Sequence, residues 1–106
     1  MSFHWRSHGL SREIRAIGPE RGYVKFSANV FWLRADGTRC VPGQEVLATF
    51  DDATAWTTWP PSDQAERGHL RAPSDAITGA ISFKLSTVVA GRTVRVWVDD
   101  VAFAAE

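Results

Sequence analysis

The sequence contains few residues that could cross-link the chain or hold a metal ion. Cys40 is its one cysteine among 106 residues, so no disulfide can form within the chain. One thiol and three scattered histidines are also a poor set of transition-metal ligands. Side-chain packing must therefore supply the stability, and we interpret Cys40 as an ordinary loop cysteine rather than a reactive thiol.

An excess of charge of either sign is also missing. Twelve Lys and Arg residues balance twelve Asp and Glu residues, which gives a formal net charge of zero. Domains that bind nucleic acids usually carry a basic surface, so this balance argues against DNA or RNA as a partner. Arg outnumbers Lys by ten to two, a bias that indicates a GC-rich genome.

Long hydrophobic runs are absent as well. Nearly uncharged stretches such as residues 77–83 are far shorter than the roughly 20 apolar residues that span a bilayer. Residues 1–8 lack the apolar centre of a signal peptide. We therefore expect neither insertion into a membrane nor ordinary secretion.

What the sequence does contain is the alternation of apolar and polar residues that is typical of β-strands. The clearest example covers residues 23–33, and residues 3–17 fit either a helical turn or a strand. About six short strands and no convincing helix predict one all-β domain over residues 1–106, an antiparallel β-sandwich or jelly roll. Residues 51–68 are interpreted as irregular, and the further predicted strands are 45–50, 69–71, 76–87 and 92–104.

The last predicted strand changes its apolar phase partway along. Val96 and Val98 share one parity, whereas Val101 and Phe103 share the other. Because a strand alternates with a period of two, this change predicts a bulge or kink at residues 99–100.

Four segments form an ordered signature, namely residues 23–28, Trp56, residues 71–76 and residues 91–103. Together they resemble the C-terminal part of carbohydrate-binding modules of the family 4/9 type. The resemblance implies a galactose-binding-like jelly roll. The opening strands of that family have no counterpart here, so the expected fold is shortened at its N-terminal end. Unpaired edges would then be covered by a partner or by a second copy.

A sugar-binding site is predicted around two tryptophans. Trp56 and Trp59 are the candidate stacking residues, because an indole face packs on the apolar face of a pyranose. An alternative stays open in which one of them, Trp56 in particular, packs in the core or anchors a loop. The candidate polar partners are Asp51, Asp52, Gln64 and Arg67.

Two further sets of residues are candidates for a metal and for an interface. The resemblance implies that Asp99 and Asp100 match an acidic pair that helps to ligate calcium in the family. We favour capping of a bulge, or pairing with Arg92 or Arg95, over calcium, and we expect no other cofactor. Core or interface packing is predicted for tryptophans on or near strands, and the interface candidates are Trp5 and Trp97.

The predicted function is binding or assembly without catalysis. No nucleophile elbow and no glycosidase-type carboxylate pair is evident, so an enzyme is not expected. We expect a component of a phage virion, a capsid decoration or minor tail protein made in the host cytoplasm, with a protein partner or self-association and a cell-surface or cell-wall glycan as ligand. Two alternatives stay open: a purely architectural subunit, and an extracellular glycan-binding module detached from a polysaccharide-degrading enzyme.

Overall fold

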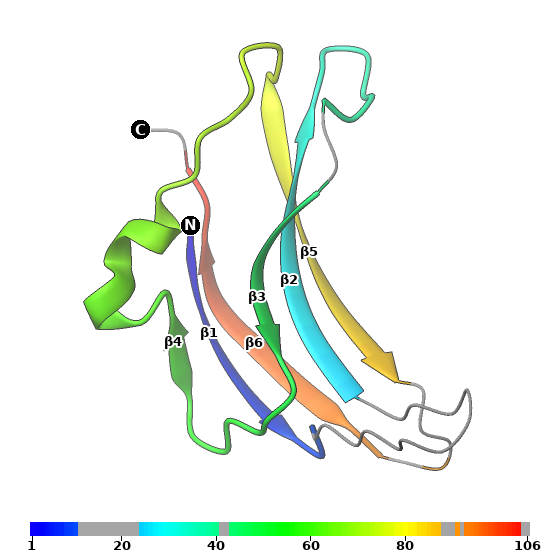
Figure 1. Cartoon of the computed structure of the whole chain (residues 1–106), viewed down its shortest axis with the longest axis vertical. Helices are drawn as coiled ribbons and strands as arrows, with labels where there is room; N and C mark the ends of the chain where they lie inside the picture. Colours follow the sequence, from blue (N-terminus) through cyan, green and yellow to red (C-terminus); the bar gives the residue numbers. More distant parts are fainter. Residues whose placement is uncertain (11–23, 41–42, 88–90, 92, 105–106) are drawn as a thin grey trace, which may run out of the picture.

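The computed structural model describes residues 1–10, 24–40, 43–87, 91 and 93–104. Within these ranges the regular structure consists of six β-strands and one short 3₁₀-helix (Figure 1). The elements in chain order are β1 (Ser2–His8), β2 (Val24–Leu33), β3 (Gln44–Thr49), β4 (Thr57–Trp59), η1 (Ser62–Gly68), β5 (Thr78–Thr87) and β6 (Arg95–Ala102).

The strands form two antiparallel sheets of three strands each. Their orders are β4-β1-β6 and β3-β2-β5, so β1 and β2 are the central strands. In Figure 1 the N-terminal strand β1 runs between β4 and β6, which come from later parts of the chain. This arrangement confirms the predicted all-β antiparallel sandwich.

The core lies between the two sheets and is built from alternate residues of β1 and β2. Phe3 and Trp5 of β1 are buried, and so are Phe26 and Trp32 of β2. Aromatic rings make contacts between the sheets: Phe3 meets Phe83 of β5 edge-on at 5.1 Å between centroids, and Trp5 lies 5.5 Å from Phe26. The period of two found in the sequence therefore selects which face of each central strand is apolar.

The predicted irregularity near the end of the last strand is confirmed as a β-bulge. Ser2 pairs with Ala102 and His4 pairs with Asp99, so β6 advances three residues where β1 advances two. Asp100 absorbs the extra residue with a φ of 52°, a left-handed conformation that Asp tolerates better than most residues. The bulge explains why the apolar phase of β6 reverses.

Two expectations from the sequence were wrong. Residues 51–68 contain β4 and η1 and are not wholly irregular. Residues 69–71 form no strand, because they cross from η1 towards β5 without a pairing partner among the described residues.

The choice between helix and strand near the N-terminus is settled for β1 as strand, whereas residues 11–17 lie outside the described ranges. No described helix has the length and hydrophobicity needed to cross a bilayer.

Candidate functional site

The outward face of the β4-β1-β6 sheet presents polar and aromatic side chains side by side. On β1, Phe3 and Trp5 point into the core, so His4 and Arg6 take the opposite face. The pairing of β1 with β6 then sets Arg6 directly across from Trp97. Residues that are 91 positions apart in the sequence thus become neighbours on one surface.

Arg6 holds two tryptophans at the centre of this face. Its guanidinium carbon lies 4.4 Å from the ring centroid of Trp97 and 5.3 Å from that of Trp56. Both distances are within the range of a cation–π interaction, which contributes about 0.5–1 kcal/mol at an exposed site. We call Arg6, Trp56 and Trp97 the outer aromatic cluster. Trp56 is 50% exposed and Trp97 is 37% exposed, so both rings remain accessible to a ligand.

Polar groups lie on the same face as the outer aromatic cluster. His4 Nδ1 is 2.9 Å from Asp100 Oδ2, and the Asp100 backbone N–H donates to Asp99 Oδ1 at 2.8 Å. His4 precedes Arg6 by two residues on β1, and Asp99 follows Trp97 by two residues on β6, so these side chains share the outward face. Aromatic surface and hydrogen-bonding groups therefore occur together.

Of the two predicted stacking residues, only Trp56 is available at the surface. Trp59 is 2% exposed and stacks on Phe3 at 5.3 Å between centroids, with 20° between the ring planes. The alternative in which Trp56 packs in the core is wrong, and so is the prediction that Trp59 lies at the surface as a stacking residue. The reason is spacing: an odd separation of three residues in extended backbone puts two side chains on opposite faces.

Arg67 packs over Trp59 and bonds to Gln64, and neither side chain has a described contact with the exposed ring of Trp56. Arg67 donates one hydrogen bond to Gln64 Oε1 at 3.1 Å and another to the backbone oxygen of Val46 at 2.9 Å. Its guanidinium carbon also lies 5.8 Å from the ring centroid of Trp59. These contacts fasten η1 over the core.

Asp52 joins the end of β1 to the connection between β3 and β4. Its carboxylate accepts hydrogen bonds from the Ser7 hydroxyl at 3.0 Å and from the backbone N–H groups of Gly9 and Leu10 at 2.9 and 2.8 Å. Partial burial alone would raise the pKa of Asp52, but these hydrogen bonds outweigh it and hold the pKa below its usual value. Asp51, its exposed neighbour, makes no comparable side-chain contact among those described.

The other predicted site residues divide between core and surface. Trp5, an interface candidate, is 6% exposed and packs in the core, so its placement at an interface is corrected. Trp97 is on the surface. Asp99 accepts the backbone N–H of Asp100, and Asp100 pairs with His4. The described residues contain no group of three or more His, Cys, Asp or Glu side chains that could hold a metal ion. Calcium at this pair stays a prediction.

Cys40 is half-buried and packs against the core. Burial raises the pKa of its thiol, and the nearby negative charge of Asp75 raises it further. The thiol is therefore kept protonated and is a weak nucleophile. This agrees with an ordinary structural cysteine.

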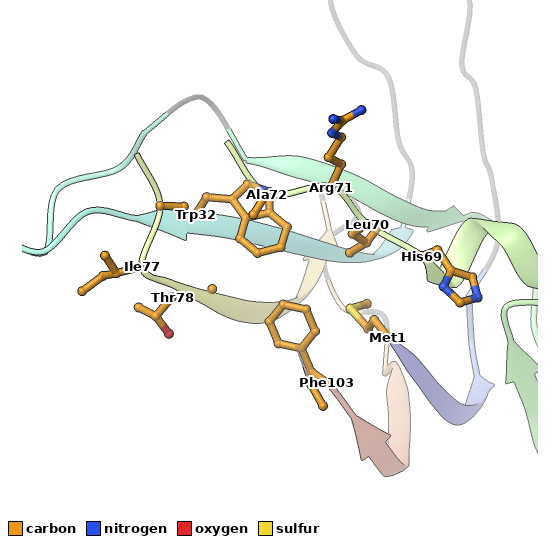
Figure 2. Close-up of a pocket in the computed structure, with 12 residues that line it drawn as sticks. Met1, Trp32, His69, Leu70, Arg71, Ala72, Ile77, Thr78 and Phe103 are labelled. Atoms are coloured by element: carbon orange, nitrogen blue, oxygen red, sulfur yellow. The ribbon is translucent and has the colours of Figure 1, made fainter. Parts of the chain in front are cut away.

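A cavity of about 610 Å³, here called the end cavity, opens at one end of the sandwich (Figure 2). The rings of Trp32 and Phe103 lie 5.9 Å apart in its wall at 50° to each other, and Met1 and Leu70 extend the apolar surface. Figure 2 shows the guanidinium of Arg71 directed away from the rings. His69, Arg71 and Thr78 add polar groups to this lining, but Trp32 is only 8% exposed, so the outer aromatic cluster offers more indole surface to a sugar than the cavity does.

Comparison with known proteins gave no match, whether to family models, to curated proteins or to solved structures. The resemblance to family 4/9-type carbohydrate-binding modules has no support from these comparisons and stays a prediction. Function must therefore be argued from the residues of the site.

The residue that sequence reasoning missed is Arg6. The sequence pattern assigned no role to Arg6, whereas in the structure its guanidinium stands over two indole rings. The alternation of β1 indicates that Arg6 points away from the core. The position of Trp97 beside Arg6 depends on the pairing of β1 with β6, which alternation alone does not specify.

Proposed function

We propose that this chain is a non-catalytic β-sandwich module that binds a glycan on the outer aromatic cluster and works within a larger assembly. A phage virion is the proposed setting, with the chain as a capsid decoration or minor tail protein. The observation that carries the proposal is the pair of exposed indole rings, Trp56 and Trp97, held by one guanidinium on an open sheet face.

The chemistry of this face suits a sugar. The C–H groups of a pyranose pack on an indole ring, and its hydroxyl groups need donors and acceptors within hydrogen-bonding distance. Rings that are already fixed lose little conformational freedom on binding, which favours affinity. Arg6 provides that fixation, while His4 and Asp99 supply polar groups on the same face.

Binding without catalysis is proposed because the carboxylates on this face already have structural partners. Asp100 contacts His4 across the bulge, and Asp99 accepts the N–H of Asp100. A glycosidase requires two carboxyl groups on either side of a scissile bond, one of them free to donate a proton. Adjacent residues that stabilise a bulge do not supply that arrangement.

The virion setting is supported by composition and by fold class. A small extracellular domain usually carries disulfides, and this chain has one cysteine. Sandwiches of the jelly-roll type recur in virion proteins, which reach the exterior when the host cell lyses. The bias towards Arg and Ala fits a phage of a GC-rich host.

Isothermal titration calorimetry with a panel of cell-wall and surface glycans tests glycan binding. We expect Trp56→Ala and Trp97→Ala each to weaken binding at least tenfold, because each removes one stacking surface. Leu85→Ala is the matched control, since Leu85 is 44% exposed but belongs to the other sheet. Absence of binding to the whole panel, or equal binding by the tryptophan variants, would overturn the proposal.

A further inference from the structure

The edge strand β6 has a free side on which another strand can add. It pairs with β1 along one edge, and none of the described residues pairs with its other edge. An edge strand presents unpaired backbone N–H and C=O groups, so it is a template for pairing with another chain.

The outward residues of β6 form a symmetric charge pattern around one tryptophan. Arg95, Trp97 and Asp99 face outward opposite His8, Arg6 and His4 of β1. The central residue is Trp97, with a positive charge two residues before it and a negative charge two residues after it. Neither Arg95 nor Asp99 forms an ion pair with another described residue.

We propose that β6 pairs antiparallel with β6 of a second copy of this chain, about a two-fold axis beside Trp97. In this register Arg95 of each copy lies opposite Asp99 of the other, and the two Trp97 side chains are cross-strand neighbours. Residues directly opposite in an antiparallel pair have Cβ atoms about 4.5–5.5 Å apart, close enough for ion pairs and ring contacts. The two sheets would join into one six-stranded sheet, β4-β1-β6-β6-β1-β4.

A two-fold interface requires that one surface be complementary to itself, and the β6 pattern meets this requirement. The other three edge strands do not: β3 has Glu45 as its single charged residue, and β4 has none. The same holds for β5. Its single charged residue is Lys84, so two copies of β5 have no opposite charges to pair. The bulge at Asp100 ends the regular part of β6, which restricts the pairing to residues 95–99 and so selects the register.

The inference rests on the proposal that the chain works within a larger assembly, and it identifies β6 as the contact between two copies. It also places the two outer aromatic clusters next to each other across the axis. A glycan chain could then be held by both copies, and binding of a long chain would gain from the higher effective concentration.

Two charge reversals and their mixture test the pairing. Sedimentation velocity of the full chain is expected to show a dimer, and Arg95→Asp and Asp99→Arg are each expected to weaken dimerisation at least tenfold. Each single variant places like charges opposite each other twice. An equimolar mixture of the two variants places opposite charges together at both positions, so a heterodimer is expected to form.

The control is Lys84→Glu on β5, which is expected to leave the dimer intact. A monomeric wild-type chain, single variants that dimerise as the wild type does, or a mixture that stays monomeric would each overturn the inference. Glycan titration of the same samples separates the two proposals. A monomer that binds glycan contradicts the β6 contact alone, whereas a dimer that binds none contradicts the proposed glycan ligand alone.

Discussion

The two faces of the β4-β1-β6 sheet use the same residue types for different purposes. On the inner face, Trp5 and Trp59 are buried against Phe26 and Phe3, and their rings contribute to folding. On the outer face, Trp56 and Trp97 are half-exposed around Arg6. Strand parity and pairing, and not residue type, therefore decide whether a tryptophan in this chain is buried in the core or exposed on the outer face.

The largest expected effect lies on the inner face, where removal of a ring leaves a cavity. We expect Trp59→Ala to lower the free energy of unfolding by about 3–5 kcal/mol, because a fully buried aromatic side chain loses its packing. Trp56→Ala is the control and is expected to lower it by less than about 1 kcal/mol. Urea unfolding measures both. Equal losses for the two variants would contradict the contrast between the faces.

Two adjacent carboxylates provide a second comparison. Asp52 accepts three hydrogen bonds at the end of β1, whereas Asp51 makes none of them. We expect Asp52→Ala to lower the free energy of unfolding by about 1 kcal/mol at neutral pH, a value reduced for solvent exposure of the group. Asp51→Ala is expected to change it by less than about 0.5 kcal/mol. A larger loss for Asp51→Ala would mean that the carboxylate contacts are assigned incorrectly.

The lowered pKa of Asp52 predicts an acid-sensitive component of stability. The group is ionised in the folded chain to a lower pH than in the unfolded chain, so its contribution is full above the unfolded pKa near 4. It is lost as the pH falls through the lower folded pKa. We therefore expect wild-type stability to fall more steeply between about pH 5 and pH 2 than that of Asp52→Asn. Parallel pH profiles for the two chains would rule this out.

An effect no larger than that of Asp52→Ala is expected from the cation on the outer face. Arg6→Met keeps the apolar stem but removes the guanidinium from between Trp56 and Trp97, and we expect a loss of about 1 kcal/mol in the free energy of unfolding. The fluorescence of the two exposed rings should shift as they become more mobile. Arg71→Met is the control, because Arg71 lies in the wall of the end cavity and contacts neither ring. No change in fluorescence for Arg6→Met would contradict the proposed fixation.

Much of the fold could be predicted from the alternation of apolar and polar residues. The two segments in which a strand was missed or wrongly predicted are each only three residues long. The alternation of residues 23–33 marked β2, and the phase change in the last strand located the bulge at Asp100. The three-residue strand β4 was missed because it is too short to show a period. Residues 69–71 were wrongly predicted as a strand because an apolar residue between polar ones also occurs where no pairing partner is present.

The candidate site was harder to predict than the fold because it is assembled by pairing. Trp56 was predicted as a ligand-binding residue and Trp97 as an interface residue. Their shared contact with Arg6 depends on β1 lying beside β6. Trp59 was assigned to the surface although its odd spacing from Trp56 could have indicated opposite faces. The sequence pattern does not specify which residues of β1 and β6, at opposite ends of the chain, pair with each other.

Glycan binding on the outer aromatic cluster is tested by following the indole N–H signals of the five tryptophans by NMR while a glycan is added. Single Trp→Phe variants assign the signals. Binding on the outer aromatic cluster predicts that the signals of Trp56 and Trp97 shift with ligand concentration while those of Trp5 and Trp59 stay fixed. Shifts confined to Trp32, which lines the end cavity, or no shift with any glycan of the panel, would contradict the account.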